Sequence, residues 1–305
     1  MLHMTDRYAA HADFIRPACG ARELWRVLMM IIAFEVVFAL SPQIFTAFLP
    51  GEAAVDAFYE GTTAFGTLAQ FFSFGIVGAG FIVLLRLLHG RGFWSLIGPV
   101  AAAKQDLIRV AWAVAAWLLV LEFLPPWIDT ADLAQVRNFG TWLILVPVAL
   151  LALLVQVGTE EIFFRGYLQQ QFACISRSRL AWMVVPSVMF GALHYWNGNG
   201  VAEGTLWAIW ATVLGIACAD LTARTGNLGA AIGLHLANNA FALLIVGVKD
   251  WPSSGVALFL YPYEDPALYS YGAEALLNPW VILQLLTMLV SVTIMWLAAR
   301  IAIKR

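Results

Sequence analysis

The sequence predicts an all-α, polytopic membrane protein built as a bundle of about eight transmembrane helices. Of its 305 residues, 62% are hydrophobic and 12% are charged, whereas soluble domains carry about 25% charged residues. Several apolar runs reach the roughly 20 residues that a helix needs to cross the hydrocarbon core of a bilayer. Stretches rich in glycine and proline separate these runs. The composition therefore excludes an ordinary soluble fold.

Eight apolar segments, each bounded by polar or turn-forming residues, are the expected spans. Residues 1–23 precede them as a cytoplasmic tail, and residues 24–305 form a single transmembrane domain because no break has the composition of a linker. The expected spans are 24–49, 64–88, 107–124, 141–168, 180–195, 205–221, 228–248 and 280–303.

The basic residues predict the orientation of the bundle, because Lys and Arg near span ends are retained in the cytoplasm. With both termini inside, the basic residues near span ends fall on the cytoplasmic side except Arg137 and Lys249. The formal net charge is only -2 and the cations are scattered, so nucleic acid is not an expected partner.

The three cysteines are expected to be packing residues, with lipidation of Cys174 as an alternative. Cys19, Cys174 and Cys218 form no CxxC pair and are odd in number. This pattern argues against a disulfide framework and against a thiolate metal cage.

The fourth span holds three ionisable residues in the segment 158–166. Such groups cost about 2.5–3.5 kcal/mol each at the centre of a bilayer, so they invite a functional interpretation. Glu161 and Arg165 are four residues apart and share a helix face, so they can pair. Glu160 points about 100° away, which leaves it available as a general base. The alternative is a buried ion cluster that only locks helices together.

The fifth span ends with His194. Glu160 and His194 are almost equally distant from the turn at residues 176–178, so an antiparallel hairpin places both side chains at one depth, roughly 20 Å from the hairpin tip. Together they could bind and deprotonate one water molecule. The alternative interpretation is that His194 is a hydrogen-bonded core or interface residue without a catalytic role.

The seventh span carries His235 and Asn239, again four residues apart on one face. Both side chains can donate to the oxyanion that forms when water adds to a carbonyl group. Hydrogen bonding between helices is the simpler explanation for either residue alone. Three spans that each offer polar groups at similar depth favour one shared site.

These residues resemble the motif set of the CPBP (Abi) family of glutamic-type intramembrane endopeptidases, to which the CAAX prenyl endopeptidases of the Ras-converting type belong. The resemblance covers residues 146–244 and makes residues 141–248 the expected protease core. The matching motifs are EExxxR at Glu160, Glu161 and Arg165, FxxxH at Phe190 and His194, and HxxxN at His235 and Asn239.

The resemblance implies hydrolysis of a peptide bond in a membrane-embedded or lipid-modified substrate, in the cytoplasmic (inner) membrane of a bacterium. By this resemblance Glu160 and His194 activate water, and His235 and Asn239 form the oxyanion hole. Glu161 and Arg165 support the site, and no metal or cofactor is required. The expected partners are membrane lipid and the substrate; the motifs do not specify whether that substrate is prenylated.

Two alternatives to this mechanism remain. The first is a zinc-dependent intramembrane protease, since Glu160, His194 and His235 are legitimate zinc ligands. The second is a non-catalytic membrane protein, either a scaffold that confers immunity or a transporter, because intramembrane Glu and His also serve proton relays.

Overall fold

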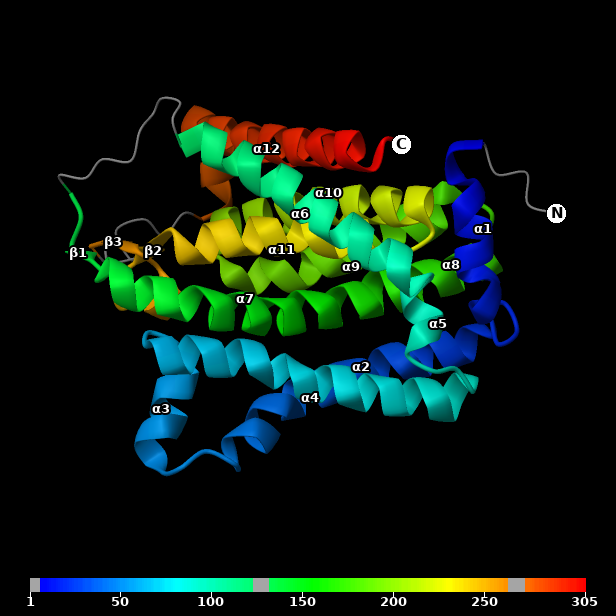
Figure 1. The fold of residues 1–305 in the computed structure, drawn as a ribbon, viewed down its shortest axis with the longest axis horizontal. Coiled ribbons are helices and arrows are strands. Elements are labelled where there is room, and N and C mark those ends of the chain that lie inside the picture. The colour runs from blue at the N-terminus through cyan, green and yellow to red at the C-terminus, as the bar shows by residue number, and fades with distance from the viewer. Residues whose placement is uncertain (1–5, 123–131, 263–271) are drawn as a thin grey trace.

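The computed structural model describes residues 6–122, 132–262 and 272–305, and these form a bundle of helices with one small β-sheet at one end (Figure 1). Within these described residues, five helices are long and apolar enough to cross a membrane. The all-α, polytopic membrane fold predicted from the sequence is therefore confirmed. The five helices are α2 (Leu24–Thr46), α4 (Ala64–His89), α7 with its continuation (Phe139–Ile175), α10 (Val201–Thr225) and α12 (Pro279–Ile303).

Helices also occupy the three other predicted spans, although these helices are shorter or more polar. The first half of α6 is interrupted by charged residues, α9 has 9 residues, and α11 has 16. The number of membrane crossings thus stays a prediction, and the end of the predicted third span, residues 123–124, lies outside the described residues. The bounds are Val100–Glu122 for α6, Val185–Leu193 for α9 and Gly229–Leu244 for α11.

Short elements join the long helices and close the ends of the bundle. The strand order is β1-β3-β2, with β1 antiparallel and β2 parallel to β3. Figure 1 shows this sheet at one end of the bundle, and α1 with the C-terminal end of α12 at the other. The bounds are Asp6–Tyr8 (η1), Ala9–Ile15 (α1), Arg16–Ala18 (η2), Glu52–Glu60 (α3), Trp94–Ile97 (α5), Gln135–Val136 (β1), Ile162–Gln169 (η3), Gln170–Ile175 (α8), Leu180–Val184 (η4), His194–Asn197 (η5), Val246–Val248 (β2), Ser254–Val256 (η6), Phe259–Tyr261 (β3) and Ala273–Leu277 (η8).

The described part of the predicted N-terminal tail packs against the bundle. The Tyr8 hydroxyl donates to Asp220 Oδ1 on α10 at 2.5 Å. His11 is 1% exposed, and this burial lowers its pKa to about 4, so the ring is neutral near pH 7. The tail therefore covers one end of the helices instead of extending into solvent.

A disulfide bond joins Cys19 to Cys174, which lies in α8. The expectation that all three cysteines are packing residues is thus wrong for this pair, whereas Cys218 is buried and free as expected. The two partners are 155 residues apart in sequence. Their proximity arises because the N-terminal segment folds back onto the end of α8, which a spacing rule cannot detect.

Close contact between α11 and α6 orients the helix that carries His235. A Cβ atom at Gly229 would lie 1.9 Å from the Ala103 carbonyl oxygen, and one at Gly233 would lie 2.6 Å from that of Leu107. Two glycines four residues apart allow helix backbones to approach this closely in a membrane. With this face of α11 held on α6, His235 reaches α7.

We expect Gly233→Ala to destabilise the protein, because the new methyl group meets a backbone oxygen that cannot turn away. Overpacking of this kind costs about 1–3 kcal/mol, and thermal unfolding of the detergent-solubilised protein measures it. The matched control is Gly158→Ala on α7, where an added Cβ meets no atom of a neighbouring element within 4 Å among the described residues. Equal melting temperatures for the two variants would contradict the close packing of α11 on α6.

Candidate active site

The helix α7 ends at Glu161, where the π-helix η3 begins. A π-helix inserts an extra residue into the helical turn and occurs frequently at functional sites. Glu160 and Glu161 are therefore the last residues of regular helix before a change of register. The chain then continues without a break into α8.

The Glu161 carboxylate is the centre of a buried polar network. Its side chain is 0% exposed, and its Oε1 accepts hydrogen bonds from Arg165 Nη1 at 3.0 Å and from His235 Nδ1 at 2.8 Å. The thiol of the buried Cys218 on α10 lies beside the same carboxylate. The pairing of Glu161 with Arg165 that the four-residue spacing predicted is thus present, and it extends to the seventh predicted span.

The Arg165 guanidinium is enclosed by aromatic and small residues. Its Cζ lies 4.6 Å from the centre of the Phe190 ring, within the range of a cation–π interaction. On another side Gly215 makes room for it, since a Cβ there would lie 2.9 Å from Arg165 Nη2. Phe190 therefore has a physical role in the FxxxH motif, which the sequence analysis did not assign.

Glu160 lies in a different environment from its neighbour Glu161. Its side chain is 14% exposed, and its Oε2 is 3.7 Å from His235 Nε2. The same Oε2 is buried and accepts no hydrogen bond from any residue that the structure describes. His235 thus stands between two adjacent carboxylates, with Nδ1 bound to Glu161 and Nε2 facing Glu160.

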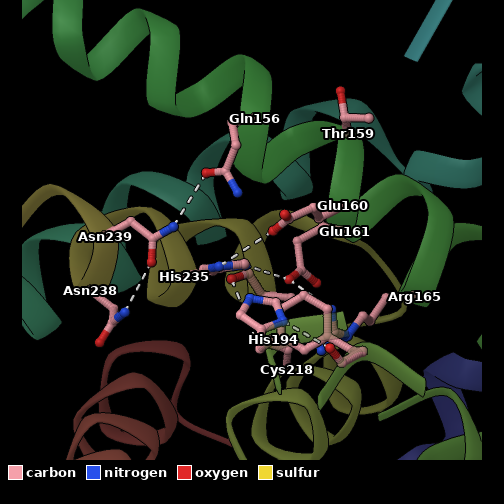
Figure 2. Close-up of polar contacts among 12 residues, drawn as sticks. Gln156, Thr159, Glu160, Glu161, Arg165, His194, Cys218, His235, Asn238 and Asn239 are labelled. Carbon is pink, nitrogen blue, oxygen red and sulfur yellow. Dashed lines mark hydrogen bonds and ion pairs between the residues drawn. The ribbon is translucent and has the colours of Figure 1, made fainter. Parts of the chain in front are cut away.

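His194 opens the short helix η5, directly after α9. Its Nδ1 lies 2.8 Å from the Phe190 carbonyl oxygen, so Nδ1 carries the hydrogen and donates it, because a carbonyl oxygen can only accept. Glu160 is near enough to act on the ring electrostatically. Figure 2 shows Glu160, His194 and His235 turned toward one another from α7, η5 and α11.

Asn239 lies one turn farther along α11 and contacts a residue that the sequence analysis missed. Its Nδ2 donates to Gln156 Oε1 at 3.3 Å, and its Oδ1 accepts from Asn238 Nδ2 at 3.0 Å. The structure therefore brings Glu160, His194 and His235 together and places Asn239 beside them. The available signal for Gln156 was its position four residues before Glu160 on the same helix face.

In both histidines Nδ1 contacts a protein acceptor, and among the described residues no hydrogen bond to Nε2 is present. This arrangement suits a base that activates water, and it also suits a metal ligand, whose second nitrogen is commonly hydrogen-bonded. Within residues 6–122, 132–262 and 272–305, no group of three His, Cys, Asp or Glu side chains lies close enough to hold a metal ion.

Comparison with known proteins identifies the same region of the chain. Residues 141–241 match the family model described as "Type II CAAX prenyl endopeptidase Rce1-like", so the resemblance to the CPBP (Abi) family is confirmed. The chain is also 25% identical, over 271 residues, to "Uncharacterized protein YyaK" of Bacillus subtilis (strain 168), a match that covers 83% of this chain and 89% of that protein. No solved structure matches the chain. The family match supports a CAAX-type intramembrane protease in general.

Removal of the charge of Glu160 and removal of the charge of Glu161 should change the stability of the protein by different amounts. Glu161→Gln leaves the buried Arg165 guanidinium without its carboxylate, which costs about 3–5 kcal/mol of unfolding free energy. Glu160→Gln changes a carboxylate whose Oε2 has no hydrogen-bond donor in the described part of the chain, so the melting temperature should stay near that of the wild type. Thermal unfolding of both purified variants measures the difference, and a larger loss for Glu160→Gln would refute this division of roles.

Proposed function

We propose that the protein is an intramembrane endopeptidase that hydrolyses a peptide bond of a membrane-embedded or lipid-modified substrate. The observation that carries this proposal is the Glu160 carboxylate, whose Oε2 lies beside His235 without a hydrogen-bond donor among the described residues and which faces His194 across one shared region (Figure 2). A carboxylate and an imidazole placed in this way can hold a water molecule and remove its proton.

In the proposed reaction, Glu160 and His194 bind one water molecule, and Glu160 accepts its proton as the oxygen adds to the scissile carbonyl carbon. The carbonyl oxygen becomes an oxyanion in the resulting tetrahedral intermediate. When the C–N bond breaks, the proton passes to the departing amine nitrogen, so that a carboxylic acid and an amine leave the site. The base is then restored for the next cycle.

His235 and Asn239 are the proposed donors to the oxyanion, each worth about 2.7–4 kcal/mol of transition-state stabilisation. His235 donates to Glu161 from Nδ1, and its Nε2 is the nitrogen proposed to face the oxyanion.

The supporting roles of Glu161 and Arg165 follow from the contacts of Glu161 Oε1. By accepting from His235 Nδ1, this oxygen fixes the orientation of the imidazole ring and leaves Nε2 directed at Glu160. Arg165 holds the carboxylate in place from the next helical turn. We propose the cytoplasmic membrane of a bacterium as the location, with membrane lipid and the substrate as partners.

The test compares cells that express the native chain with cells that express Glu160→Gln. Native cells should release peptides that the variant cells lack, and the variant membranes should accumulate the intact substrate; quantitative mass spectrometry of both fractions measures this. The matched control is Glu35→Gln, which removes another carboxylate from a membrane helix, α2, outside the site. An unchanged peptide profile at equal expression would support a non-catalytic membrane protein instead.

The same proteolytic activity separates the metal-independent mechanism from the zinc-dependent alternative. We expect purified protein to retain activity after treatment with a chelator, because Glu160 and His194 suffice to activate water in the proposed mechanism. Elemental analysis of the same samples measures bound zinc. Stoichiometric zinc that is lost together with activity would contradict the metal-independent mechanism and favour the zinc-dependent alternative.

A further inference from the structure

We propose that Gln156 is a positioning residue of this site, which holds the Asn239 carboxamide so that one of its N–H groups is presented to the oxyanion. This inference rests on the proposed function and adds a residue that the EExxxR, FxxxH and HxxxN motifs do not contain. Gln156 acts through Asn239 and is not proposed to touch the reacting atoms.

The first argument is the register between α7 and α11. Residue 160 of α7 faces residue 235 of α11, and residue 156 faces residue 239. Residue numbers thus fall along one helix as they rise along the other, so the two helices are antiparallel. Each step is four residues, about 6 Å along a helix. Gln156 on α7 therefore lies opposite Asn239 on α11, just as Glu160 lies opposite His235 one turn away.

The second argument is that both ends of the Asn239 carboxamide are held. Its oxygen accepts from Asn238 Nδ2, and its nitrogen donates one hydrogen to Gln156 Oε1. A carboxamide nitrogen carries two hydrogens, so one N–H remains for the oxyanion. The reverse orientation would set the Asn239 oxygen against Gln156 Oε1 and its nitrogen against Asn238 Nδ2. Figure 2 shows Gln156, Asn239 and Asn238 in this chain of contacts.

The third argument is the burial of Gln156. Its side chain belongs to an apolar membrane helix, and the residue is only 8% exposed. A buried amide that is not well paired costs free energy, so an apolar residue would serve better if packing were the only requirement. Thr159, on the same helix, provides a contrast: Figure 2 shows it directed away from the site, and it bonds the Phe74 carbonyl of α4.

The experiment uses an internally quenched peptide that reproduces the cleavage site found by comparing native and Glu160→Gln cells, embedded in liposomes with the full-length protein. We expect Gln156→Leu to lower kcat by up to about 100-fold, the loss that a misplacement of about 1 Å in an active site can cause, with KM nearly unchanged. The matched control is Thr159→Val, which also removes a buried polar group from α7 and should leave kcat near that of the wild type. Melting temperatures of all variants show that each one is folded.

A double-mutant cycle distinguishes positioning from a general packing effect. If Gln156 acts through Asn239, Gln156→Leu should change kcat by no more than about twofold once Asn239→Ala is already present, whereas independent sites give additive effects. Additive losses, or a full-rate Gln156→Leu enzyme, would overturn the positioning role while leaving the protease intact. If no cleaved peptide depends on Glu160, the proposed function itself fails.

Discussion

The structure of this site depends on one buried carboxylate, that of Glu161. A charge within a bilayer is tolerated only when it is paired and hydrogen-bonded, and Glu161 satisfies this through Arg165 and His235. Arg165 in turn requires the Phe190 face on α9 and the space beside Gly215 on α10. His235 requires α11 to lie against α6. The relative placement of the central helices therefore follows from the need to neutralise this single group.

The same network explains how two neighbouring glutamates differ in character. Successive residues of a helix project about 100° apart, so Glu161 points into the polar network while Glu160 points at the region shared by His194 and His235. Glu161 has its charge balanced and its orientation fixed by Arg165 and His235. Each glutamate keeps a buried Oε2 without a hydrogen-bond partner in the described part of the chain, but that of Glu160 lies 3.7 Å from His235 Nε2, on the side shared with His194. Water activation requires a base that is available to accept a proton, which is the role proposed for Glu160. It also requires a stable neighbouring network, which Glu161 provides.

The sequence predicted those features that depend on helical spacing and on depth in the membrane. Glu161 and Arg165 were expected to pair from their four-residue separation, and counting from the turn at residues 176–178 placed Glu160 and His194 at one depth. The contact between Gln156 and Asn239 could not be predicted in this way, because it depends on the register between α7 and α11. The Cys19–Cys174 disulfide was missed for a related reason, since it depends on where the N-terminal segment packs.

The distribution of unpaired polar atoms argues that the network serves more than stability. A membrane bundle can be held together by apolar packing, and buried ion pairs are often replaceable by apolar residues without loss of stability. Glu160 Oε2, Glu161 Oε2 and Arg165 Nη2 are all buried without a hydrogen-bond partner in the described part of the chain. A purely structural cluster gains nothing from leaving carboxylate oxygens in this state. A site that must accept a proton from water and then release it requires such an oxygen, and Glu160 Oε2 is the one that lies 3.7 Å from His235 Nε2, one helical turn from the Gln156–Asn239 pair.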